Sequence, residues 1–216
     1  MARLIPYMLS SFVIGLAVGL WAGSSSRLAS QVSANGQKQE AVYEGRPAGF
    51  WVRQLQDRAP AFRQQAIQAL EQIGPKDEAV VPALAGMLQD RNAGVRMGAA
   101  LALRRLGPEA GAAVPALIPA LHDKNQHVRF DAVGALADIR PRDEAVLAAL
   151  IAALQDPSPL VRVRVLKTLA EIAPGSPAAL AAFRTTLQDD DVLVRHVAAD
   201  GLPKAGQQEI VRPGEK

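Results

Sequence analysis

The sequence predicts an all-α protein: an α-α superhelix of about five helical hairpins, preceded by an N-terminal hydrophobic helix. Two observations predict the superhelix. An Asp recurs every 33 residues through most of the chain, and the apolar residues between successive Asp recur at helical spacing. A third observation predicts the preceding helix, because residues 4–26 carry no charge.

The uncharged segment lies between Arg3 and Arg27 and is long enough to span a membrane. As a helix that rises ~1.5 Å per residue it would extend ~35 Å, against a hydrocarbon core of ~30 Å. The alternative is a cleaved signal peptide, since an apolar stretch at 12–23 is followed by small residues from Ala22 to Ser26. Under either interpretation we expect the rest of the chain on the exported side, as a single-pass membrane protein or as a secreted one.

Three glycines, Gly15, Gly19 and Gly23, would lie on one face of that helix, where a second helix could approach closely and form a dimer. Residues 28–47 are rich in Ser, Gln, Gly and Ala without apolar periodicity, which predicts a flexible tether. The predicted organisation is an anchor or signal peptide at 1–27, a tether at 28–47, a repeat array at 48–206 and a tail at 207–216. The predicted units of the array are 48–75, 76–108, 109–141, 142–174 and 175–206.

Four columns of identical residues run unbroken through the five units, which an Ala- and Leu-rich composition would not produce by chance. The first column holds Asp57, Asp90, Asp123, Asp156 and Asp189. A Leu stands two residues before each Asp, at Leu55, Leu88, Leu121, Leu154 and Leu187. An Arg stands six residues after it, at Arg63, Arg96, Arg129, Arg162 and Arg195, and another Leu stands 13 after it, at Leu70, Leu103, Leu136, Leu169 and Leu202.

Each unit is predicted to contain two helices. The second helix begins two residues after the Asp, at Ala59, Asn92, Asn125, Ser158 or Asp191, of which four are preferred N-caps. It ends where Gly, Arg or Ala precedes a Pro, at 74–75, 107–108, 140–141 and 173–174. The first helix contains Pro82, Pro115 or Pro119, which we expect to kink or delay it. So short a pair cannot bury its apolar face alone, so consecutive pairs should stack around one continuous core.

The array resembles HEAT repeats, in the short bacterial form also called phycobilisome-lyase-type HEAT-like repeats. The resemblance rests on Val-Pro-Ala-Leu at 81–84 and 114–117, on the Leu-x-Asp turns, and on Val-Arg pairs at 95–96, 128–129, 161–162 and 194–195. It implies a HEAT-like solenoid in which the turn Asp and the second-helix Arg interact within and between units, as a structural ladder. Such motifs are specific for fold and barely specific for function.

Composition excludes several kinds of chemistry. The chain has no Cys, which excludes disulfides, thiolate metal sites and Cys nucleophiles. Its His residues are His122, His127 and His196, and no His-Glu pair of the kind that di-iron HEAT-like hydroxylases repeat is present, so no metal, cofactor or catalytic residue is predicted. Outside the N-terminal segment, 22 basic residues face 21 acidic ones, so nucleic acid is not an expected partner. Trp51 falls in the column of Leu84 and is expected in the core.

A partner should contact the second helices, which line the concave face in HEAT arrays, at the columns 8, 11 and 15 residues after each Asp. These columns change from unit to unit and mix both signs of charge, which favours a protein or peptide partner over a phosphate backbone. The candidate partner-binding residues are Met97, Leu101, Arg105, Phe130, Arg164 and Lys167; the alternative is that these side chains pack between units. The predicted function is therefore a non-catalytic, membrane-tethered scaffold. The alternative is a HEAT-like enzyme of the bilin lyase or alkylpurine glycosylase type.

Overall fold

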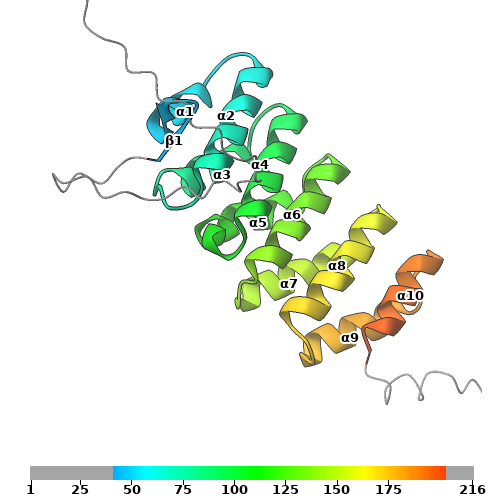
Figure 1. The fold of residues 1–216 in the computed structure, drawn as a ribbon. Helices are drawn as coiled ribbons and strands as arrows, with labels where there is room; N and C mark the ends of the chain where they lie inside the picture. Colours follow the sequence, from blue (N-terminus) through cyan, green and yellow to red (C-terminus); the bar gives the residue numbers. More distant parts are fainter. Residues whose placement is uncertain (1–40, 203–216) are drawn as a thin grey trace, which may run out of the picture. The chain divides into compact units, whose positions relative to one another are not determined.

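The computed structural model describes residues 41–202, and these residues form a row of helical hairpins (Figure 1). The first helices of the five hairpins are α1 (Ala48–Gln54), α3 (Val80–Met87), α5 (Val114–Ala120), α7 (Glu144–Ala152) and α9 (Pro177–Thr186). The second helices are α2 (Pro60–Ile73), α4 (Ala93–Leu106), α6 (Gln126–Ile139), α8 (Pro159–Ile172) and α10 (Val192–Asp200). The predicted all-α solenoid is confirmed.

The second helices begin where the capping chemistry predicts. The side-chain oxygens of Asn92, Asn125 and Asp191 accept hydrogen bonds from backbone N–H groups of the first turn of α4, α6 and α10. Ala59 and Ser158 make no such bond, and in both of these units a Pro occupies the first turn instead, where its missing N–H costs nothing.

Three of the second helices, α2, α4 and α6, end at a residue with positive φ. Gly74 and Gly107 have φ of 81° and 62°, a region that is strained for residues with a Cβ. Arg140 takes the same position after α6 with φ of 54°. After α4 the chain continues into the 3-10 helix η1 (Gly107–Ala113), so α5 begins only at Val114, with Pro115 in its first turn and Pro119 inside it. A second short 3-10 helix, η2 (Ala153–Gln155), follows α7.

The hairpins share one core. Each second helix packs against the second helix of the neighbouring unit, as α4 does against α2 and α6, and against the first helix of its own unit. The apolar column residues fill the space between them: Leu70, Leu103, Leu136 and Leu169 are fully buried. Trp51, at 1% exposure, takes the place that Leu84, Leu117 and Leu150 take in later units. No single hairpin could bury these faces alone, so the stability of each unit depends on its neighbours.

The start of the array differs from the prediction. Residues 42–47, assigned from sequence to the tether, form a hairpin of β1 (Val42–Tyr43) and β2 (Arg46–Pro47), with Val42 opposite Pro47. Its two turn residues, Glu44 and Gly45, both have positive φ, as two-residue hairpin turns require. The Tyr43 ring lies 6.0 Å from the Trp51 ring, so contacts with the first unit hold the hairpin in place.

The predicted anchor or signal peptide at 1–27, its glycines at 15, 19 and 23, residues 28–40 of the tether, and the tail lie outside the described residues. None of the helices between residues 41 and 202 has the length and apolar character needed to cross a membrane.

Candidate functional site

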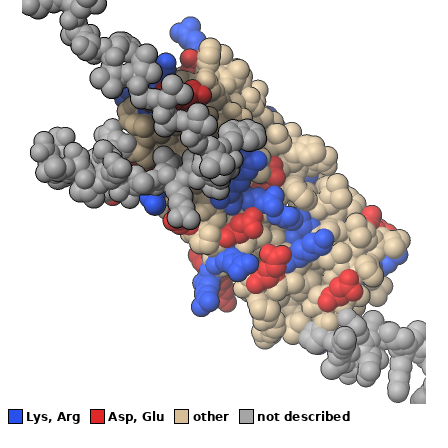
Figure 2. Space-filling view, viewed as in Figure 1, with Lys and Arg blue, Asp and Glu red and all other residues tan. Residues whose placement is uncertain are grey.

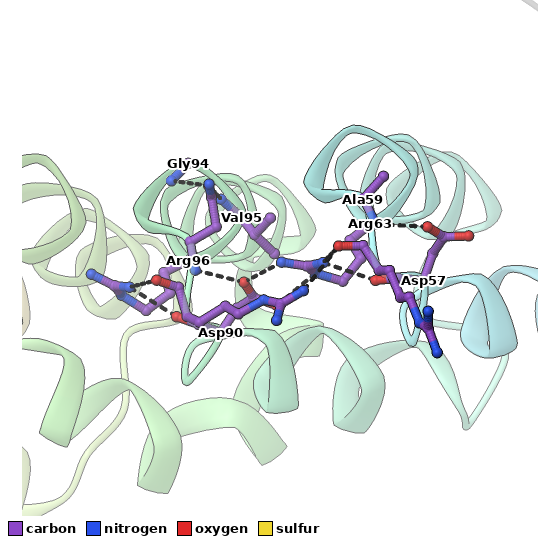
Figure 3. Close-up of polar contacts among 10 residues, drawn as sticks. Asp57, Ala59, Arg63, Asp90, Gly94, Val95 and Arg96 are labelled. Atoms are coloured by element: carbon purple, nitrogen blue, oxygen red, sulfur yellow. Dashed lines mark hydrogen bonds and ion pairs between the residues drawn. The ribbon is translucent and has the colours of Figure 1, made fainter.

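Each of the first four column Arg residues ties its unit to the next one. Arg63 donates hydrogen bonds from Nε and Nη2 to the two carboxylate oxygens of Asp90, both at 2.7 Å (Figure 3). Arg96 binds Asp123, Arg129 binds Asp156 and Arg162 binds Asp189 in the same two-pronged way, always 27 residues further along the chain. The planar guanidinium fits a carboxylate in this geometry, so each pair fixes orientation as well as distance.

The same residues also organise the turn of their own unit. Nη1 of Arg63, Arg96, Arg129, Arg162 and Arg195 donates to the backbone carbonyl of the Asp six residues earlier, at 2.7–2.9 Å. The Asp carboxylate also accepts the N–H of the residue two positions later, for example Asn92 by Asp90 at 2.8 Å. From the second unit on, each turn is therefore held by its own Arg and by the Arg of the preceding unit.

The ladder changes the ionisation of its members. Burial alone would raise the pKa of Asp90, but hydrogen bonds from Arg63 and the Asn92 N–H, with the charges of Arg63 and Arg91, outweigh it and hold that pKa below its ordinary value. The pKa values of Asp123 and Asp189 are lowered by the same balance, led by their bonds to Arg96 and Arg162. The lowered pKa values favour the ionised carboxylates, which is the form that pairs with Arg in the ladder.

A cavity of about 290 Å³ opens beside the Arg162–Asp189 pair, between the fourth and fifth units. Its lining includes Asp156, Arg162, Asp189, Thr185 and Thr186. Arg162 already binds Asp189 and also Asp190, and the Thr186 hydroxyl donates to the carbonyl of Ala182. The charged groups of its lining are thus already engaged in the ladder.

The His residues do not gather. His122 is exposed in the turn before α6, His127 is exposed at the start of α6, and His196 lies 3.5 Å from Asp200 on α10. Across residues 41–202, no three His, Asp or Glu side chains lie close enough together to hold a metal ion.

The candidate partner-binding residues lie on α4, α6 and α8. Met97 is 38% exposed and Lys167 is exposed, whereas Leu101, Phe130 and Arg164 are half-buried. Arg105 is exposed but engaged, since its Nη1 lies 3.0 Å from Glu71 on α2. The alternative that these side chains pack between units therefore applies to some of them, and Met97 and Lys167 remain open to solvent.

At the centre of this face, arginine side chains from α4 and α8 lie over α6. The Arg164 guanidinium lies over the Phe130 ring, 5.3 Å from its centroid, and passes directly above Gly134. The side chain of Arg104 approaches Gly134 from α4 and binds Asp138 at 2.7 Å.

Asp131 lies among these groups without a hydrogen bond from them. Burial raises the pKa of its carboxyl group, although the charges of Arg104, Arg164 and His127 oppose the rise. The approach of Arg104 and Arg164 to Phe130 and Gly134 was not predicted from the sequence. The available signal was Gly134, a glycine inside a helix, which often marks the close approach of another group.

Comparison with known proteins agrees with this geometry. A family model of HEAT repeats matches residues 50–114 and 114–203. No curated protein matches the sequence.

Several solved structures resemble the array. The complex of CpcE and CpcF of phycocyanin lyase from Nostoc sp. is 26% identical with a TM-score of 0.57, covering 71% of this chain and 63% of that one. YibA of E. coli is 22% identical with a TM-score of 0.62, covering 76% and 61%. A designed armadillo repeat protein in complex with the peptide (KR)4 is 22% identical with a TM-score of 0.56, covering 70% and 78%. This chain thus spans less than two thirds of the lyase subunit and of YibA.

Proposed function

Because this chain belongs to the HEAT-repeat family, we propose that it is a non-catalytic scaffold that binds a protein or peptide along its second helices. The observation that carries the proposal is that each unit combines constant structural residues with variable surface residues. The ladder and the core repeat in every unit, whereas the outward side chains of the second helices change from unit to unit. Surface side chains that differ between units, held by a core that does not, are suited to recognising one particular partner.

The charges on that face favour a protein partner. Figure 2 shows basic and acidic side chains gathered together over α4, α6 and α8. A nucleic-acid-binding groove needs an excess of basic side chains, but Asp131, Asp138 and Glu171 share this face with Arg164 and Lys167. A partner with its own mixed surface fits better. The designed armadillo neighbour, which binds a peptide, supports the use of such a frame for peptide recognition.

Site-specific cross-linking tests the proposal. A photoreactive residue at Met97 or at Lys167 lies on the second-helix face, whereas one at Ala148 is also exposed but lies on the first helix α7. We expect one protein to cross-link from positions 97 and 167 and not from 148. Cross-linking of the same protein from all three positions, or only from 148, would move the binding surface off the second helices.

Bilin lyase activity is the second candidate function, favoured by the structural likeness to the CpcE and CpcF complex. Incubation of the purified chain with a bilin and an acceptor phycobiliprotein would test it. Covalent attachment above the rate without the chain would replace the scaffold with an enzyme.

We further propose that residues 4–26 hold the array on the exported side of a membrane, as an uncleaved helix. The proposal rests on the uncharged length of that segment. Carbonate-washed membranes should retain the full-length chain, and protease added from the outer side should cut the predicted tether between residues 28 and 40. A soluble product that begins near Ser24 would instead establish a cleaved signal peptide.

A further inference from the structure

Arg164 differs from every other arginine on the second helices α2, α4, α6 and α8. The others each bind a carboxylate at 3.0 Å or less: Arg63, Arg96, Arg104, Arg105, Arg129 and Arg162. Arg164 binds no carboxylate within the described part of the chain, and its Nε is enclosed without a hydrogen-bond acceptor. Because Nε is enclosed and the residue as a whole is half-buried, a partner's acceptor would have to bind the terminal nitrogens of the guanidinium.

The position of Arg164 is fixed before any partner arrives. The Phe130 ring supports one face of the guanidinium, and the lack of a side chain at Gly134 leaves room for it, since a Cβ there would lie only 2.6 Å from Nη2. Little side-chain entropy remains to be lost on binding, and this favours affinity.

A second unpaired cation lies one helical turn away. Lys167 on α8 is exposed and has no carboxylate within ion-pair distance among residues 41–202. Of the neighbouring acids, Asp138 is taken by Arg104 and Asp131 is half-buried. Arg164 and Lys167 therefore remain as two cations on one helix that bind no carboxylate among residues 41–202.

Apolar side chains lie two units before these cations, on the other side of α6. Met97 occupies the column of Phe130, and Leu101 occupies the column of Gly134, on helix α4, which packs alongside α6. A ligand that runs along the row from α4 to α8 would meet apolar surface first and the two cations next.

We propose that Arg164 and Lys167 bind a carboxylate side chain of an extended peptide segment in the partner, and that an apolar side chain of the same segment packs on Met97 and Leu101. This inference rests on the proposed function and specifies the chemistry of its partner. A basic peptide would be repelled by these two cations, and a phosphate backbone, which needs basic side chains along its whole length, would find only these two unpaired ones on α2, α4, α6 and α8.

Fluorescence anisotropy of labelled peptides against the purified full-length chain tests this inference. The probe is a peptide of repeated Leu-Ser-Glu triplets, compared with otherwise identical Leu-Ser-Gln and Leu-Ser-Lys peptides. We expect the Glu peptide to bind about tenfold more tightly than the Gln peptide, as one charge-assisted contact implies, and the Lys peptide to bind more weakly than either.

Three variants separate the site from general charge effects. Arg164→Gln removes the guanidinium and should abolish the preference for Glu over Gln. Gly134→Ala keeps every charge but places a Cβ where the Arg164 guanidinium lies, so it should also reduce the preference for Glu over Gln. Lys76→Gln removes one exposed cation in the turn after α2 and should leave the preference unchanged. Thermal unfolding of each variant by circular dichroism checks that it remains folded.

The outcomes distinguish this inference from the proposed function. Equal binding of the three peptides that is lost in Leu101→Asp would overturn the carboxylate site and keep the second-helix face as a binding surface. Preference for the Lys peptide, or a preference for Glu that survives Arg164→Gln, would also overturn it. Stronger binding of a single-stranded oligonucleotide than of any peptide would overturn both.

Discussion

Arg129 on α6 donates two hydrogen bonds to the carboxylate of Asp156, 27 residues later in the next unit, at 2.6 and 2.8 Å. The same guanidinium donates a third bond to the carbonyl of Asp123 in its own turn. One side chain therefore fixes the position of one hairpin relative to the next. Because both charged groups are nearly buried, 11% and 4% exposed, loss of either leaves the other without a partner in a poorly solvated place.

Replacing this arginine should destabilise the array. We expect Arg129→Ala to lower the free energy of unfolding by roughly 1–3 kcal/mol, because Asp156 loses its charged donor. Arg129→Lys should restore only part of this, since an ammonium group cannot make the two-pronged contact. Urea denaturation followed by circular dichroism measures both changes.

Arg195 offers a matched control for that measurement. It donates to the carbonyl of Asp189, as Arg129 does to that of Asp123, and also to the carbonyl of Asp190, but binds no carboxylate in the part of the chain that the structure describes. Arg195→Ala should therefore cost less than Arg129→Ala. An equal loss in both variants would assign the stabilisation to the carbonyl bonds and not to the pairs between units.

The ladder should make stability dependent on pH in the acid range. The pKa values of Asp90, Asp123 and Asp189 are lower in the folded chain than the ordinary carboxyl value. Their contribution is complete above the unfolded value, ~4, and is lost as the pH falls through the lower folded values. We expect the urea midpoint to fall steadily below about pH 4, and less steeply in Asp123→Asn. A midpoint that stays constant from neutral pH to pH 3 would contradict this account.

Asp131 should have the opposite effect. Its folded pKa is raised, mainly by burial, so its contribution is most favourable when the group is protonated and is lost as the pH rises through the folded value. Asp131→Asn keeps the shape and removes the buried charge, so the variant should melt at a higher temperature than the unmodified chain at pH 7. The difference should shrink at pH 3, where both side chains are neutral. A lower melting temperature at pH 7 would show that Arg104 and Arg164 stabilise the charged form more than burial opposes it.

Most of the fold could be predicted from the sequence because its determinants are local. An Asn or Asp before a segment with helical apolar spacing caps that helix through local hydrogen bonds, and a Gly before a Pro ends a helix. The unit length followed from the columns directly. The β1–β2 hairpin could not be predicted in this way, because strands of two residues show no periodicity and depend on contact with Trp51.

Which Asp each column Arg binds could not be predicted from the sequence, for a different reason. Each column Arg has one Asp six residues before it and another 27 residues after it, and both spacings repeat equally well. The structure divides the two roles, since Arg96 takes the carbonyl of Asp90 and the carboxylate of Asp123. The position of Arg164 over Phe130 likewise depends on how α6 and α8 pack against each other, which no pattern within one unit predicts.

The repeat phase itself can be tested by deletion. Removal of the 33 residues from Asp90 to His122 places Asp123 where Asp90 stood, again 27 residues after Arg63, so the ladder and every core column remain in register. Removal of only 16, from Asp90 to Arg105, deletes most of α4 and leaves the first helices without their partner. We expect the longer deletion to unfold cooperatively with a smaller urea m-value, in proportion to the surface it has lost, and the shorter one to lose cooperativity and helicity. Equal helicity and equally sharp transitions in the two deletions would show that the stacking unit is not the 33-residue hairpin.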